Sequence, residues 1–131
     1  MGQLLHYNLI PPAPPENSTN LERFMVVEFV EQVRKTLIDG GLAKKEDNVE
    51  QGGQFLVGVQ GRLFKICDDF QVAESLDPYM AAGCGEDFIL GSFHTTDGLG
   101  FEPRERVRLA LEAATYFSGG VSEPFNIERL N

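Results

Sequence analysis

Two β-rich runs separated by a tight turn most constrain the fold of this chain. The first run, residues 54–59, reads QFLVGV, and the second, residues 63–67, reads LFKIC. β-branched and aromatic residues favour strands, and Gln60-Gly61 between the runs is a short turn signal that contains glycine. The sequence therefore predicts an antiparallel hairpin near the middle of the chain.

More strands are expected after the hairpin. Residues 70–74 alternate apolar with polar side chains, residues 79–83 form a short apolar run, and Asp77-Pro78 fits a turn between them. A last short strand is expected over residues 124–127. Consecutive strands joined by short turns indicate a mainly antiparallel sheet.

A long amphipathic helix is predicted over residues 21–38, because its apolar residues recur at three- and four-residue steps. Thr19 and Glu22 have the spacing of a capping box, and Gly40-Gly41 fits a left-handed helix end. The expected buried face consists of Leu21, Phe24, Met25, Phe29, Val30, Val33 and Leu37.

Two further helices are expected in the C-terminal part. Residues 86–93 begin with Glu86 and Asp87, which favour a first helical turn. The last helix begins at Pro103 and ends at Gly119-Gly120. Its expected buried stripe is Val107, Ala110, Leu111, Ala114 and Phe117. The whole order predicts an α+β fold, with a mainly antiparallel sheet covered by helices on one face.

The first 20 residues contain the run Pro11-Pro12-Ala13-Pro14-Pro15, which favours an extended conformation. We therefore expect residues 1–20 to be an extended proline-rich lead-in outside the core. Residues 21–131 then form one domain, because the chain length of 131 residues fits a single domain.

The charge of the chain argues against nucleic acid as a partner. It has 20 Asp and Glu against 11 Lys and Arg, a formal charge of −9, and acidic residues interrupt its basic groups. No apolar run approaches the ~20 residues that span a bilayer, so no membrane partner is expected. Two cysteines without a secretory signal favour the cytoplasm.

Two kinds of site can be weighed from residue types alone. Cys84 and His94 could form a thiol nucleophile with its base, although a free cysteine is more often a small buried residue. Asp68-Asp69 and Glu86-Asp87 could offer oxygen ligands, but neither has EF-hand spacing or accompanying His and Cys ligands. No metal is expected.

The glycines around Gly83 and Gly98 match neither a phosphate-binding loop nor a dinucleotide fingerprint. No nucleotide or other cofactor is therefore expected.

Three blocks in order carry a resemblance to a known family. They are residues 55–66 (FLVGVQGRLFKI), residues 82–91 (AGCGEDFILG) and residues 106–121, in which ALEAA leads into SGGV. Together they resemble the second half of a proteasome β-type subunit of the Ntn hydrolase family, and the proteasome-like subunits of bacteriophages in particular. The resemblance spans roughly residues 20–127 and implies half of an αββα sandwich, so residues 21–131 would be a partial proteasome-β-like domain.

The nucleophile of that family is an N-terminal Thr, Ser or Cys whose α-amino group can act as base. This chain begins Met1-Gly2-Gln3, and Gly2 has no side chain with which to attack a carbonyl. Thr19 lies at a helix start, and Thr95-Thr96 do not open a strand. The resemblance therefore assigns no catalytic residue and implies that this chain alone is not a working peptidase.

The resemblance does assign a vestigial shell around the missing nucleophile. Cys84 takes the place of a serine that orients the nucleophile, and Ser118 matches a second supporting serine. Thr115 stands where the family usually has an aspartate, which weakens the expected charge network.

The resemblance implies a truncated or degenerate subunit that acts through assembly. It would cover its open sheet with copies of itself, or with a complementing N-terminal fragment. One alternative is a phage-type binding module that blocks a host protein, for which the acidic surface would suit a basic interface. A third hypothesis is a fragment of an active threonine-type peptidase with a longer reading frame.

Overall fold

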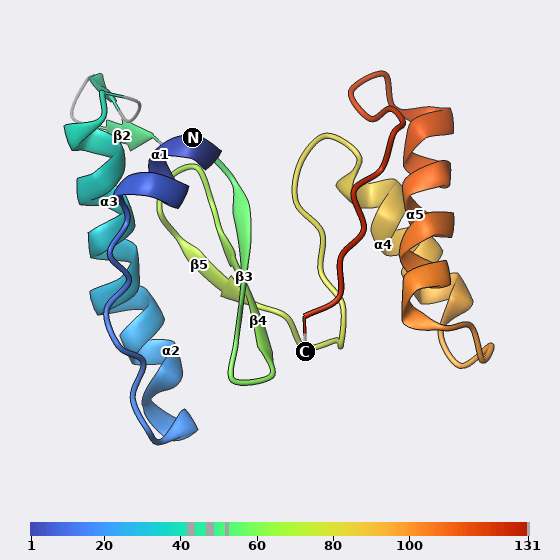
Figure 1. Cartoon of the computed structure of the whole chain (residues 1–131), viewed down its shortest axis with the longest axis horizontal. Helices are drawn as coiled ribbons and strands as arrows, with labels where there is room; N and C mark the ends of the chain where they lie inside the picture. The colour runs from blue at the N-terminus through green and yellow to red at the C-terminus, as the bar shows by residue number, and fades with distance from the viewer. Residues whose placement is uncertain (42–43, 47–48, 52, 131) are drawn as a thin grey trace. The chain divides into compact units, whose positions relative to one another are not determined.

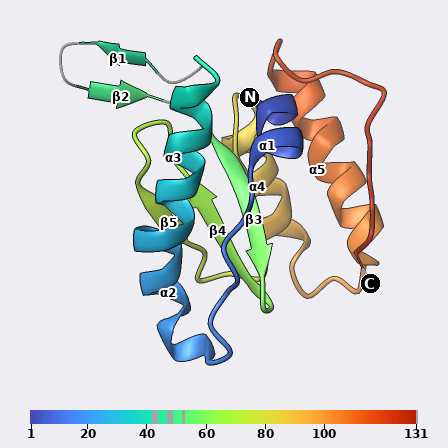
Figure 2. The same cartoon turned by 60° about the vertical axis from the view of Figure 1, so that its left-hand side comes forward.

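The computed structural model describes residues 1–41, 44–46, 49–51 and 53–130. The chain divides into two compact units, Met1–Pro78 and Tyr79–Asn131. Figures 1 and 2 show the course of the chain through both units in two views. Each unit has its own packing and is described by itself.

One continuous helical stretch dominates the first unit and confirms the helix expected over residues 21–38. It consists of the 3-10 turn η1 (Ser18–Asn20), α2 (Leu21–Phe24), the π-helical segment η2 (Met25–Phe29) and α3 (Val30–Asp39). Every residue of the expected buried face is buried. Beyond α3, Gly41 has a φ of 72°, so the glycine stop is confirmed.

The expected capping box at the start of this stretch is wrong. Asn17 caps it instead, because the backbone N–H of Thr19 donates to Asn17 Oδ1 over 2.9 Å. The 3-10 turn η1 precedes α2. The unpaired N–H groups at the start of the helical stretch therefore lie about one turn earlier than the apolar periodicity predicts.

The lead-in is not extended throughout. Helix α1 (Gly2–Asn8) replaces the extended segment expected there. The side chains of Met1, Leu4, Leu5 and Leu9 are partly buried and pack against the core of the first unit, so this segment is not detached from the core.

The expected hairpin is confirmed as β3 (Phe55–Val59) and β4 (Arg62–Ile66), which pair antiparallel. Gln60 and Gly61 have φ values of 50° and 74°, the left-handed pair of a type I′ turn. Strand β5 (Val72–Glu74) pairs antiparallel with β4, and the sheet order is β3-β4-β5. The expected α+β fold with an antiparallel sheet is therefore confirmed, and the sheet is open.

The core of the first unit lies between this sheet and the helical stretch α2–α3. Phe64 and Ile66 of β4 are fully buried, and they belong to one apolar cluster with Leu21, Val33 and Leu37 of the helices. The core face of β3 is formed by Phe55, Val57 and Val59, whereas Leu56 and Gly58 alternate onto the opposite, exposed face.

A second, two-stranded sheet was not expected. It is formed by β1 (Lys44–Glu46) and β2 (Val49–Gln51), which pair antiparallel. Lysine and glutamate have low strand propensity, so the charged sequence of this segment gave no strand signal.

The second unit is a pair of packed helices, α4 (Glu86–Thr96) and α5 (Pro103–Phe117). Helix α5 has the expected start and end, and α4 extends three residues beyond its expected end at Phe93. Phe93, Ala110 and Ala114 are buried between the helices. Phe117 was expected in the buried stripe of α5, but 66% of its surface is exposed.

The strands expected over residues 79–83 and 124–127 are both wrong, because neither segment forms a ladder. Residues 79–83 are apolar for another reason: the Tyr79 ring packs against Phe93 at 5.2 Å between centroids, and Ala81 is buried. Pro124 lacks the N–H that a ladder would need.

No helix within the described residues has both the length and the apolar character needed to cross a membrane.

Candidate functional site

The structure brings together two of the three residues assigned to the vestigial shell. Ser118 Oγ donates a hydrogen bond to the backbone carbonyl of Cys84 over 3.5 Å, and the N–H of Gly120 donates to Ser118 Oγ over 3.4 Å. Cys84 itself is exposed. A short polar bridge therefore joins the turn before α4 to the turn after α5.

Glycine makes this approach possible. A Cβ on Gly120 would collide with Cys84 Sγ. A Cβ on Gly85 would lie 2.7 Å from Val121 Cγ2 and 3.0 Å from Ala114 Cβ, which is closer than real Cβ contacts. Gly85 and Gly120, one in each turn, thus allow the two turns to pack this closely.

Thr115, the third residue, does not join them. Its Oγ1 donates to the carbonyl of Leu111 over 2.9 Å, one turn back along α5. The hydroxyl is therefore engaged within its own helix.

The Cys84–His94 dyad is not formed. Cys84 precedes α4, and His94 lies near its other end, so the helical rise alone separates them by about 12 Å. Among the described residues, no three His, Cys, Asp or Glu side chains gather as a metal would require. In the acidic pair Asp68-Asp69, Asp69 Oδ1 accepts from the N–H of Gln71 over 3.1 Å, as in a turn.

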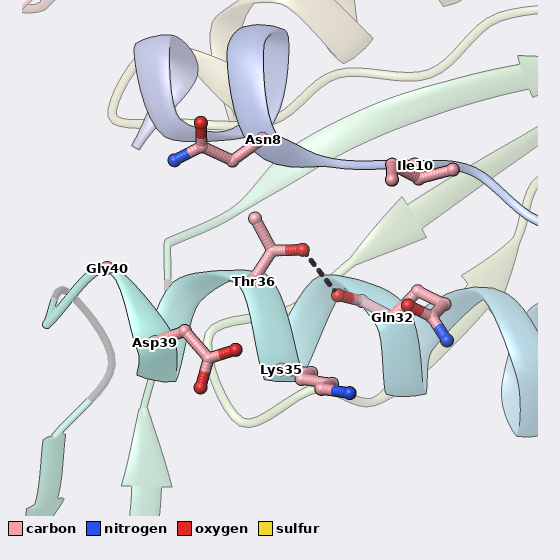
Figure 3. Close-up of a pocket in the computed structure, with 7 residues that line it drawn as sticks. All are labelled: Asn8, Ile10, Gln32, Lys35, Thr36, Asp39 and Gly40. Atoms are coloured by element: carbon pink, nitrogen blue, oxygen red, sulfur yellow. Dashed lines mark hydrogen bonds between the residues drawn. The ribbon is translucent and has the colours of Figure 1, made fainter.

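A pocket of about 240 Å³ lies beside α3 in the first unit, and Figure 3 shows its lining. Thr36 Oγ1 donates to the carbonyl of Gln32 over 2.7 Å. Ile10, from the lead-in, is 83% exposed at its margin. The remaining lining residues are Asn8, Lys35, Asp39 and Gly40. This is a shallow, open groove, and sequence reasoning missed it because α1 was not expected.

Three exposed aromatic side chains lie together on the second unit. The rings of Phe88 and Phe117 are stacked with centroids 5.4 Å apart, and Tyr116 meets Phe117 edge-on at 4.9 Å. All three side chains are exposed, by 39%, 66% and 84%. The sequence did not predict this surface, because Phe117 was expected to be buried in the stripe of α5.

The free edge of β3 has a defined hydrogen-bonding pattern. A two-residue type I′ turn is closed by a hydrogen-bonded pair, here Val59 and Arg62. Because hydrogen-bonded pairs alternate along an antiparallel ladder, Phe55 and Val57 also bond to β4. Leu56 and Gly58 then direct their N–H and C=O groups away from β4, along the outer edge of the sheet.

An independent hydrogen bond supports this assignment. Leu63 lies opposite Gly58, and its carbonyl accepts from the N–H of Ser75, on the side of β5. Leu63 therefore turns its backbone groups away from β3, as a member of a non-hydrogen-bonded pair must. Within the described part of the chain, no backbone partner is found for the outward groups of Leu56 or Gly58.

This edge lacks the features that usually protect a free strand. Its sequence, FLVGV, contains no charge and no proline, whereas exposed edges commonly carry lysine, proline or a bulge. The opposite edge, β5, is only three residues long and includes Glu74, which pairs with Arg62 at 2.6 Å. We refer to the outward groups of Leu56 and Gly58 as the β3 edge.

The lead-in does not satisfy the β3 edge. Gln60 Nε2 donates to the carbonyl of Pro15 over 2.8 Å, but this is a side-chain contact beyond the end of the strand. Among the residues that the structure describes, no backbone hydrogen bond joins residues 9–17 to β3. The prolines of the lead-in have no N–H to offer.

Comparison with protein-family models, with curated proteins and with solved structures finds no match for this chain.

Proposed function

We propose that this chain is an assembly subunit that binds its partner by strand addition at the β3 edge. The observation that carries the proposal is the pair Leu56 and Gly58, whose backbone groups face outward from a neutral five-residue strand. An added strand would extend the open three-stranded sheet by one ladder.

The energetics favour occupation of this edge. Each backbone hydrogen bond formed on binding contributes about 0.5–1.5 kcal/mol net, and apolar strands gain further from cross-strand contacts. An unoccupied neutral edge also exposes a template on which other strands can pair. A specific partner strand removes that exposure.

The sequence resemblance supports the same proposal. If the chain corresponds to the second half of a proteasome β-type subunit, its sheet is part of an αββα sandwich and has neighbouring strands in the complete fold. A partner that adds a strand would then act as the complementing segment or as another copy of the subunit.

A photoreactive side chain at the edge tests the proposal. Benzoylphenylalanine at the exposed Gln54, directly before β3, should form a covalent adduct with the partner in the cells that make the chain, whereas the same group at Ala73 on β5 should not. Leu56→Pro should abolish the adduct, because it removes an outward N–H that β4 does not use.

Leu56→Thr is the matched control, since it shortens the side chain and keeps the N–H. It should retain the adduct, and circular dichroism should show that both variants fold. An adduct that survives Leu56→Pro unchanged would show that the partner does not pair with this strand.

A further inference from the structure

The outward groups of β3 are arranged symmetrically about Val57, one residue before it and one after it. A strand with this arrangement can pair antiparallel with an identical strand about a two-fold axis. We propose that the partner at the β3 edge is a second copy of this chain, paired through β3 with Val57 opposite Val57. This inference rests on the proposed function and names its partner.

The register follows from which residues face outward. With the axis at Val57, Leu56 of each copy lies opposite Gly58 of the other, so outward residues meet outward residues. Each of these two pairs exchanges both of its N–H···O bonds. Val57 and its counterpart form the non-hydrogen-bonded pair between them.

Other symmetric registers use the edge less completely. An axis at Leu56 would place Gly58 opposite residue 54, before the strand begins at Phe55. An axis at Gly58 would place Leu56 opposite residue 60, in the turn. The axis at Val57 alone brings both outward residues of β3 into hydrogen-bonded pairs.

The side chains fit this register. On the core face, Val57 would contact Val57, and Phe55 would face Val59, so every pair on this face is apolar. On the other face, Leu56 is 40% exposed and would lie against Gly58, which has no side chain to obstruct it. The paired sheets would run continuously in the order β5-β4-β3-β3-β4-β5.

The absence of charge in β3 makes a second copy a suitable occupant. Each chain has a formal charge of −9, yet no charged residue lies in the strand that would be shared. A strongly basic partner segment, in contrast, would find no carboxylate within β3 with which to pair.

A cysteine at the symmetry axis tests the register. In a Cys67→Ser, Cys84→Ser background, Val57→Cys should give a disulfide-linked dimer on mild oxidation. The Cα atoms of a non-hydrogen-bonded pair lie about 4.5 Å apart, within disulfide range.

Leu56→Cys in the same background is the control. Leu56 is more exposed than Val57, so random collisions would link it at least as readily. In the proposed register, however, the two position-56 residues are diagonal neighbours about 7–8 Å apart, which is too far for a bridge. We expect efficient linkage at position 57 and little at position 56.

The outcomes separate this inference from the proposed function. If Leu56→Pro abolishes the photoadduct but Val57→Cys does not cross-link, strand addition stands and the second copy in this register is refuted. If Leu56→Pro has no effect and Val57→Cys does not cross-link, both fail. Linkage at 57 without linkage at 56, lost on adding Leu56→Pro, supports both.

Discussion

At the scale of single residues, Arg106 secures the end of α4 against α5. Its Nη2 donates to the carbonyl of Phe93 over 2.8 Å, and its Nε donates to Thr96 Oγ1 over 3.2 Å. The guanidinium also lies over the rings of Tyr79 and Phe93, at 5.6 and 5.7 Å from their centroids. One arginine thus satisfies a carbonyl in the last turn of α4 and covers two aromatic rings.

We predict that Arg106→Ala lowers the free energy of unfolding by about 1–3 kcal/mol, because a partly buried carbonyl and hydroxyl lose their donor. Arg106→Lys should recover little of this, since an ammonium cannot reproduce the planar fork. Urea denaturation measures the change. Arg104→Ala, at an exposed position of α5, is the control, and an equal effect there would contradict the special role of Arg106.

The ion pair between β4 and β5 gives a pH dependence. Arg62 donates from both Nε and Nη2 to the carboxylate of Glu74, each over 2.6 Å, and these hydrogen bonds hold the pKa of Glu74 below its ordinary value of 4.5. The unfolded chain therefore binds the proton more readily than the folded chain. Stability from this pair is present above pH 4.5 and is lost as the pH falls through the lowered pKa.

We predict that Glu74→Gln makes the unfolding free energy less dependent on pH below about pH 4.5, because the amide does not titrate. Denaturation curves measured at several acidic pH values provide the comparison. The same curves for Glu16→Gln, in the exposed lead-in, provide the comparison with a carboxylate outside the sheet. If the unfolding free energy of Glu74→Gln depended on pH as steeply as that of the unmodified chain, the pH dependence could not be assigned to the Arg62–Glu74 pair.

At the scale of elements, the parts that sequence reasoning could predict carry their own local signals. The turn Gln60-Gly61 permits the left-handed φ values of a hairpin, and Pro103 favours the first turn of α5. The long helix has an apolar period that persists over several turns. Each of these signals acts within a few residues of the element that it specifies.

The elements that sequence reasoning missed depend on distant contacts. Helix α1 has no side-chain cap, and it is held by packing of Leu4 and Leu5 on the core. Residues 79–83 have the composition of a strand, but they pack on α4 instead. A short apolar run does not reveal which kind of surface it will cover.

The candidate sites could be predicted only in part. The resemblance named Cys84 and Ser118 but predicted no contact between them, and their hydrogen bond joins two turns that are far apart in the sequence. The β3 edge could not be predicted, because it depends on β3 being the outermost strand and on the parity set by the turn. Neither property is encoded within the strand itself.

At the scale of the whole molecule, the formal charge of −9 acts against association of two copies. We predict that the dimer becomes more populated as NaCl is raised from low concentration to about 0.5 M, because salt screens the repulsion between the copies. Sedimentation velocity over a dilution series measures the monomer and dimer fractions. Leu56→Pro should remain monomeric at every salt concentration.

The opposite salt response would have a clear meaning. A dimer that dissociates as salt is added would be held by attraction between opposite charges, which β3 does not contain. Such a result would place the contact elsewhere on the chain.

The two unlike edges of the sheet also bear on stoichiometry. When two copies pair through β3, each uses its single unguarded edge, and the borders that remain are the short β5 strands with their Arg62–Glu74 pairs. A two-fold contact of this kind is closed, because it leaves no second copy of the same surface available. In the proposed dimer, addition of strands to this sheet would therefore stop at two chains and would not continue into a fibre.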